Sequence, residues 1–126
     1  MFETLRITIL GHEPVAKISD KTLERLLRRE FGDHASEVKE KLLHVKSDTP
    51  GGKNRISAAI LKLSNGDLDK INYYIDLCNQ DFRDVVAPAE YPRYTAVAFN
   101  EIPRWKKRQF YLADWKEYSN WLRESS

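Results

Sequence analysis

The chain has 126 residues, and its 21 lysines and arginines against 19 aspartates and glutamates give a formal charge of +2. This length suits one domain, and a hydrophobic content of 41% with few glycines and prolines predicts a folded chain rather than a disordered one. The single cysteine, Cys78, excludes an internal disulfide framework and a cysteine-based zinc site. The nearly balanced charge argues against a general binder of polyanions.

No segment of the sequence has the pattern of a targeting or membrane-spanning element. Glu3 and Arg6 interrupt the apolar residues of the first ten positions, and no cleavage site follows them, so we expect no signal peptide. The apolar runs elsewhere, such as residues 58–61, are far shorter than the roughly 20 residues of a membrane span. We therefore expect a soluble cytoplasmic protein without membrane contact.

The first elements in the chain are a strand and a helix. Residues 1–10 alternate apolar and polar side chains, which predicts a β-strand, and a loop follows to residue 17. Ser19 or Asp20 then caps a helix that ends at Phe31, because apolar residues recur there every three or four positions.

A very short joint leads to the next helix. Gly32 supplies the left-handed conformation that ends many helices, and Asp33 is the expected N-cap of a second helix that reaches Val45. Residues 47–54 are rich in Gly, Pro, Ser and Asp and form the clearest predicted loop. A third amphipathic helix is expected over residues 54–64.

The second half of the chain is harder to interpret. Asp67 is the expected N-cap of a fourth helix, and a short helix over residues 81–87 is expected to bury Phe82 and to end at Pro88. Residues 94–99 have the composition of a strand, which could pair with the N-terminal strand. Asp114 is the expected N-cap of the last helix, and residues 104–112 either extend it or form another strand.

The predicted fold is mainly α: a compact bundle of about five helices, with a minor two-stranded β element. We expect one domain over residues 1–126, with a helical core at about residues 19–88 and an aromatic-rich basic segment, residues 91–126, packed on it. The predicted core consists of apolar residues on the inner faces of the first four helices: Leu23, Leu26, Leu27, Phe31, Val38, Leu42, Ile56, Ile60, Leu63, Ile71 and Ile75.

The balanced total charge hides two oppositely charged segments. Residues 65–90 carry a net charge of −4 and residues 91–126 a net charge of +3, and nine of the 14 aromatic residues lie in the second segment. One interpretation is intramolecular, with the aromatics packing on the helices and the charges facing each other. The other is that part of this segment binds a partner, since Trp, Tyr and Arg dominate interface hot spots.

Two partner surfaces follow from the second interpretation. The acidic one consists of carboxylates from the 65–90 segment: Asp69, Asp76, Asp81, Asp84 and Glu90. The basic and aromatic one consists of five consecutive residues: Arg104, Trp105, Lys106, Lys107 and Arg108.

A candidate anion site lies in the glycine-rich loop, in five consecutive residues: Gly51, Gly52, Lys53, Asn54 and Arg55. Glycines let backbone N–H groups approach a ligand, and the following helix N-terminus favours negative charge. The loop is not a Walker A motif, because Ser47 stands where the first glycine is required and Asn54 stands where Ser or Thr should follow the lysine. A plain connector with a solvated lysine is the alternative.

Catalytic and metal-binding patterns are weak. Asp81, Asp84, Glu90 and Arg93 could serve as acid–base groups or metal ligands, but the same grouping is typical of helix caps and surface ion pairs. The histidines have no metal-ligand spacing, and no nucleophile motif is present. We expect no metal and no cofactor.

The sequence therefore predicts a non-catalytic protein-interaction module of the adaptor or partner-neutralising type, acting through a charge-segregated surface. The partner is expected to be a protein. The alternative is a phosphate-ligand or nucleic-acid binding domain that uses the glycine-rich loop, the basic side of the first helix and the bases at 104–108. An enzyme is the weakest of the three hypotheses.

Overall fold

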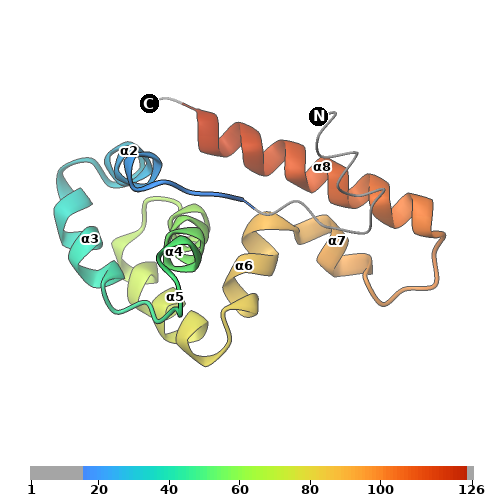
Figure 1. The fold of residues 1–126 in the computed structure, drawn as a ribbon, viewed down its shortest axis with the longest axis horizontal. Helices are drawn as coiled ribbons and strands as arrows, with labels where there is room; N and C mark the ends of the chain where they lie inside the picture. Colours follow the sequence, from blue (N-terminus) through green and yellow to red (C-terminus); the bar gives the residue numbers. More distant parts are fainter. Residues whose placement is uncertain (1–15, 125–126) are drawn as a thin grey trace.

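The computed structural model describes residues 16–124, and within them every regular element is helical (Figure 1). In chain order the elements are α2 (Asp20–Phe31), the 3₁₀ turn η1 (Gly32–His34), α3 (Ala35–Leu42), α4 (Pro50–Ser64), α5 (Leu68–Gln80), α6 (Arg83–Glu90), α7 (Pro92–Val97) and α8 (Arg104–Arg123). The mainly α fold is confirmed.

The minor β element is not found among residues 16–124. Residues 94–99, expected as a strand, belong to α7 and the turn that follows it. Their expected partner, residues 1–10, lies outside the described residues. The helix forms because Pro92 occupies the first helical position and the next N–H groups of α7 find an acceptor in α8, far away in the sequence.

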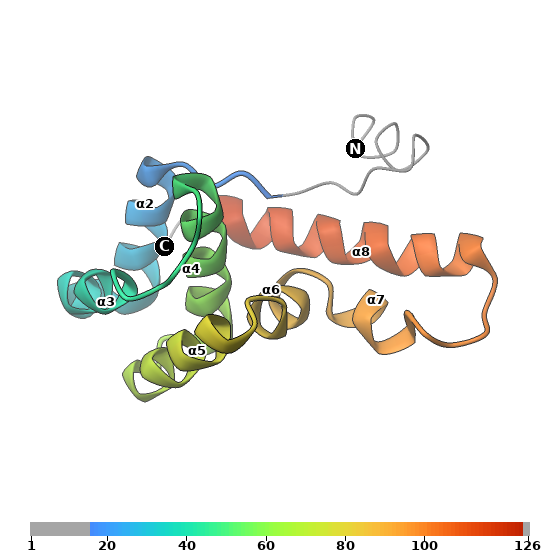
Figure 2. The ribbon, with the colours of Figure 1, turned by 60° about the horizontal axis from the view of Figure 1, so that its bottom comes forward.

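The helices form two parts that meet at α6 (Figures 1 and 2). Helices α2 to α6, residues 20–90, pack together and are called the core below. Helices α7 and α8 with their connection, residues 92–123, are called the arm. In both views the C-terminal end of α8 lies beside α2, and the connection between α7 and α8 lies farthest from α2–α5. The 20 residues of α8 span about 30 Å.

Local capping signals set several boundaries as predicted. Ser19 accepts a hydrogen bond from the Thr22 N–H at the start of α2, and Asp67 accepts one from the Asp69 N–H at the start of α5. Gly32 ends α2 with a φ of 52°, a conformation that glycine adopts without strain. The two caps and the helix end at Gly32 are confirmed, but the ψ of Gly32, −120°, differs from the left-handed helical conformation that was expected.

Two predicted N-caps are wrong. Asp33 lies in η1, and α3 begins after it at Ala35 without a side-chain cap. Asp114 lies in the middle of α8, which begins ten positions earlier at Arg104, so residues 104–112 extend the last helix. The Asp114 carboxylate instead bonds to Arg93 and Tyr94 at the start of α7.

Helix α4 begins at Pro50, so the predicted 47–54 loop is shorter than expected and its glycines are helical. The Thr49 hydroxyl caps the helix by accepting a hydrogen bond from the Gly52 N–H at 3.0 Å. Pro50 takes the first helical position, where no N–H is needed. A Cβ atom on Gly52 would lie 2.6 Å from the Ser47 hydroxyl, so a larger residue there would force the Ser47 side chain to shift.

Helix α6 does not end at Pro88 but continues to Glu90. Pro88 lies on the exposed side, where water can satisfy the carbonyl group that a proline leaves unpaired. The continuation carries Glu90 into the interior, where it is 1% exposed. Phe82, expected to be buried, is 48% exposed at the other end of this helix.

The hydrophobic interior lies mainly between α2, α3, α4, α5 and α6, as the apolar periodicity of the sequence predicts. Nine of the predicted core residues are buried: Leu26, Leu27, Phe31, Val38, Leu42, Ile56, Ile60, Ile71 and Ile75. Leu23 and Leu63 are partly buried and pack against them. Tyr118 from α8 joins the same cluster, which attaches the arm to the core.

None of the helices within residues 16–124 is long and apolar enough to cross a membrane.

Candidate functional site

The start of α7 is held by a carboxylate from α8. Asp114, 1% exposed, accepts hydrogen bonds from the backbone N–H groups of Arg93 at 3.3 Å and Tyr94 at 2.9 Å, and from the Arg93 guanidinium at 2.9 Å. The same guanidinium reaches Glu117 at 2.6 Å. Asp114 is therefore an N-cap, but of α7 rather than of its own helix, and it closes the arm into a helical hairpin.

The C-terminal half of α8 is attached to α2. The Arg29 guanidinium donates hydrogen bonds to the carbonyl oxygens of Trp121 and Glu124, both at 2.7 Å, and Arg25 donates to the Leu122 and Glu124 carbonyls. Cations at a helix C-terminus satisfy carbonyls that lack intrahelical partners and complement the helix dipole.

Ring contacts strengthen this attachment. Arg29 lies 4.8 Å from the Trp121 ring centroid, and that ring stacks on Tyr118 at 5.6 Å. A guanidinium over an aromatic face is an attractive arrangement. Arg25 and Arg29, which the phosphate-binding hypothesis would use, therefore bond to carbonyl groups within the molecule.

A buried ion pair joins α4 to α6 beneath the arm. Arg55 donates two hydrogen bonds to the Glu90 carboxylate, at 3.0 and 2.9 Å, and Glu90 is 1% exposed. Burial lowers the pKa of Arg55, but the bonds and charge of Glu90 outweigh it and raise the pKa above its usual value. Burial, followed by the charge of Glu90, raises the pKa of Tyr91 to about 12.

The same region contains Lys62 and the buried Tyr118. Lys62 donates a hydrogen bond to the Ala89 carbonyl at 2.7 Å and lies 5.1 Å from the Tyr118 ring centroid. Burial lowers the pKa of Lys62. The buried Tyr118 hydroxyl has no hydrogen-bond partner among residues 16–124. The buried carboxylates bond to partners within the core or within the arm, whereas the contact of Lys62 with the Tyr118 ring joins the two parts.

The other end of the arm projects from the molecule. We call residues 98–106, which connect α7 to α8 and begin α8, the tip. Phe99 is 99% exposed and Trp105 is 61% exposed. Arg104 and Lys106 are also exposed, and neither has an acidic partner among residues 16–124.

The predicted basic and aromatic surface is divided by the structure. Arg104, Trp105 and Lys106 belong to the tip, whereas Lys107 donates a hydrogen bond to the Ala98 carbonyl at 2.8 Å and Arg108 is half-buried. The sequence hypothesis did not include Phe99. It had placed Phe99 at the end of the predicted 94–99 strand, whereas the structure places it in the turn after α7.

The predicted acidic surface is also divided. Asp69, Asp76 and Asp84 are exposed on α5 and α6, and Asp81 pairs with Arg83 at 2.9 Å. Glu90 lies in the interior with Arg55, so it belongs to no surface. The six salt bridges within residues 16–124 do not join the acidic 65–90 segment to bases of the 91–126 segment.

The candidate anion site lies in the first turns of α4, and its side chains make internal contacts. Lys53 donates to the Leu43 carbonyl at 3.2 Å, and the Asn54 amide donates to the Ile18 carbonyl and to Asp20. The N–H of Gly52 is taken by the Thr49 hydroxyl, and Arg55 pairs with Glu90. Gly51 is exposed and has open space around it.

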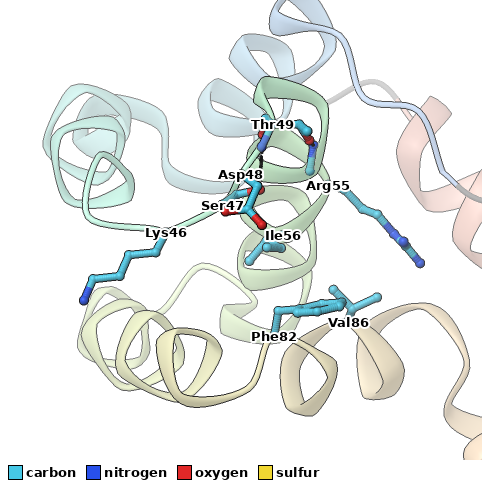
Figure 3. A pocket seen from close by; sticks show the side chains of 9 residues that line it. Lys46, Ser47, Asp48, Thr49, Arg55, Ile56, Phe82 and Val86 are labelled. Atoms are coloured by element: carbon cyan, nitrogen blue, oxygen red, sulfur yellow. Dashed lines mark hydrogen bonds between the residues drawn. The ribbon is translucent and has the colours of Figure 1, made fainter.

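A pocket of about 420 Å³ lies beside this turn, between the 46–49 loop, α4 and α6 (Figure 3). Its apolar lining comes from Ile56, Phe82 and Val86, and Ser47 and Asp48 contribute polar groups. Lys46 and Arg55 also line it, and in Figure 3 the end of the Lys46 side chain points away from the other lining side chains.

Groups suited to metal binding or nucleophilic catalysis are sparse in the described part of the chain. Residues 16–124 contain no cluster of three His, Cys, Asp or Glu side chains that could hold a metal ion. Cys78 is buried, and burial raises the pKa of its thiol, which keeps it protonated. Its thiol donates to the Ile75 carbonyl at 3.1 Å, as expected of an interior cysteine.

Comparison of the chain with protein-family models, with curated proteins and with solved structures found no match.

Proposed function

We propose that this protein is a non-catalytic interaction module that binds a partner protein through the tip of its arm. The observation that supports the proposal is the exposure of Phe99 and Trp105, at 99% and 61%, on a projecting helical connection. An isolated exposed aromatic is ordinary on a protein surface, but two at one projecting turn with unpaired bases beside them are typical of a binding surface.

The composition of the tip indicates what kind of partner it fits. Tryptophan and arginine contribute most often to interface hot spots, and Trp105 lies directly beside Arg104. Arg104 and Lys106 form no ion pair among residues 16–124, and with Glu101 they leave the tip a net charge of +1. A partner with an apolar recess bordered by carboxylates complements both features.

The attachment of the arm supports a role in presenting the tip. Arg25 and Arg29 attach the C-terminal half of α8 to α2, and Asp114 closes the hairpin of α7 and α8. A fixed support reduces the conformational entropy that the tip would lose on binding. The cytoplasmic location expected from the sequence is part of this proposal.

Affinity capture with the full chain, followed by measurement on the purified partner, tests the proposal. Trp105→Ala and Phe99→Ala should each weaken binding roughly tenfold or more, because both remove large apolar contacts. Binding should also weaken as salt concentration rises, since Arg104 and Lys106 contribute charge attraction. Tyr73→Ala is the matched control, because Tyr73 is exposed to 62% on α5, away from the tip.

Equal binding by Trp105→Ala and the unchanged protein would contradict the proposal. So would tight binding of a labelled oligonucleotide at low salt that is lost in Arg104→Ala and Lys106→Ala, because it would assign the tip to phosphate groups.

A further inference from the structure

The connection between α7 and α8 carries one of the two exposed aromatics of the tip. Phe99 is 99% exposed, so its ring has almost no packing contact that could fix its position. Trp105 lies on α8 itself, where the hydrogen-bonded helical backbone holds it in place. The position of Phe99 relative to Trp105 therefore depends on how the backbone of the connection is held.

The backbone of the connection forms hydrogen bonds within itself. The Asn100 N–H donates to the Val97 carbonyl, and the Ile102 N–H donates to the Asn100 carbonyl, both at 3.0 Å. These bonds join residues two or three positions apart, so they shape the turn but do not tie it to the body of α8. A further bond from α8 is needed to fix the connection against that helix.

Lys107 on α8 supplies such a bond. Its ammonium group donates to the Ala98 carbonyl at 2.8 Å, across nine positions. Ala98 is the C-cap of α7, where carbonyl groups lack partners within the helix and a cation is favourable. Because Ala98 directly precedes Phe99, the bond holds the chain at the residue before the exposed ring.

The environment of Lys107 differs from that of its basic neighbours. Arg104 and Lys106 are exposed, whereas Lys107 is half-buried. The first turn of α8 contains no acidic residue and has no side-chain cap, so a cation there opposes the helix dipole without a local partner. Lys107 instead reaches the end of α7, which indicates a role in the shape of the connection rather than in charge attraction to a partner.

We propose that Lys107 is a positioning residue of the tip. Its bond to the Ala98 carbonyl holds Phe99 at a fixed place relative to Trp105, in the arrangement that the partner binds. Such ordering before binding reduces the conformational entropy that is lost in the complex. This inference rests on the proposed function and adds to it a residue that acts through Phe99.

Backbone order in the free protein is the first test, measured by ¹⁵N relaxation of the Phe99 and Asn100 amides. We expect order parameters of about 0.85 in the unchanged protein and below about 0.6 in Lys107→Met, which keeps a long side chain but removes the donor. Lys107→Arg keeps a cationic donor and should retain the order. Lys106→Met is the matched control, because it removes the same charge from an exposed neighbour and should leave the order unchanged. Far-UV circular dichroism checks that each variant retains its helices.

A double-mutant cycle on binding separates positioning from direct contact. The probe is the purified partner protein whose affinity falls in Trp105→Ala. Lys107→Met should weaken its binding roughly threefold to tenfold, because the partner must then order the connection itself, and Lys107→Arg should restore the affinity. In a Phe99→Ala background Lys107→Met should have almost no further effect, since Lys107 acts through Phe99. Lys106→Met should weaken binding by the same factor in both backgrounds.

Unchanged order at Phe99 and Asn100 in Lys107→Met overturns the inference, and so does a loss of order that leaves binding unchanged. An equal effect of Lys107→Met with and without Phe99 also overturns it, because Lys107 would then contact the partner directly. If the partner loses affinity for Trp105→Ala but not for Lys107→Met, the inference fails and the proposed function stands. If no partner depends on Trp105 or Phe99, both fail.

Discussion

Both halves of the arm are rich in aromatic residues, but these residues lie in opposite environments. In the inner half, Tyr118 is 0% exposed and Trp121 lies under the Arg29 guanidinium. In the outer half, Phe99 and Trp105 face solvent and the neighbouring bases have no acidic partner in the described chain. The aromatic, basic segment therefore contains both a packing surface, near the C-terminal end of α8, and an exposed surface, at the tip.

This contrast shows why composition alone could not choose between the two interpretations of the segment. Each interpretation holds for one part of the 91–126 segment. The inner aromatics attach the arm to the core, as the intramolecular interpretation requires, but the attaching charges are Arg25 and Arg29 of α2 rather than acids of the 65–90 segment. The outer aromatics remain available for the partner that we propose.

The largest effect on stability is expected at Tyr118, where the C-terminal half of α8 packs into the core. Tyr118→Ala should lower the free energy of unfolding by about 4 kcal/mol, because it leaves a cavity where a fully buried ring stood. Urea unfolding measures this change. Tyr118→Phe is the control: it removes a hydroxyl that has no partner among residues 16–124 and should be neutral or slightly stabilising. A loss of more than about 1 kcal/mol in Tyr118→Phe would show that the hydroxyl is hydrogen-bonded in solution.

The buried ion pair should give the next largest effect. Glu90→Ala leaves the Arg55 guanidinium partly buried without its acceptor, and we expect a loss of about 3 kcal/mol in urea unfolding. Replacing both residues with Met and Leu should restore most of this loss, because no charge then remains unpaired. Equal losses in the single and double variants would contradict the role assigned to the pair.

Alkaline pH should lower the free energy of unfolding through Tyr91, which lies between α6 and α7. Its pKa is raised from 10 to about 12 in the folded protein, so the stability it contributes is fully present below about pH 10 and is lost as the pH rises towards 12. We expect a decrease of about 2 kcal/mol over this interval that is smaller in Tyr91→Phe. Urea unfolding at several alkaline pH values measures it, and an unchanged pH dependence in Tyr91→Phe would contradict it.

Removing the attachment at α2 should have a smaller, local effect. Arg29→Ala removes two hydrogen bonds to carbonyls at the end of α8 and the contact with Trp121, and we expect a loss of about 1–2 kcal/mol. Amide hydrogen exchange should speed up in the last turns of α8. The neighbouring Arg28 is exposed, so Arg28→Ala should change stability by less than about 0.5 kcal/mol.

The tip should contribute almost nothing to folding. Trp105→Ala should leave the free energy of unfolding within about 0.5 kcal/mol of the original value, because the side chain makes few internal contacts. Thermal unfolding followed by circular dichroism measures this. A large loss of stability would show that the tip packs within the molecule and would remove the contrast between the two halves.

Regular patterns in the sequence predicted the interior of the core well. The apolar periodicity of α2 and α5 identified their buried faces, and Ser19 and Asp67 marked their first residues. These two signals succeed because the cap and the helix it serves are a few residues apart, although the equally local signal of Asp33 failed. The start of α4 was predicted at residue 54 rather than at Pro50, because the low helix propensity of its two glycines outweighed the cap signal of Thr49.

The candidate site was only partly predictable. The hypothesis identified Arg104, Trp105 and Lys106 but placed Glu90 on a surface, because the alternation of acids and arginines gives no information on burial. It also interpreted residues 94–99 as a strand and Asp114 as the cap of its own helix. One contact explains both errors: Asp114 caps α7 across 20 positions, and no local rule detects a cap at that separation.

The sequence by itself determined the helical class and most of the interior, because hydrophobic periodicity and short-range capping act within one or two turns. Only the tertiary structure decided how the charged and aromatic residues are divided. Glu90 is buried by its pairing with Arg55, the end of α8 is held by arginines from α2, and the tip is exposed because the arm extends beyond the core. The physical reason is that burial and charge pairing depend on which segments meet in space, and these segments lie far apart in the chain.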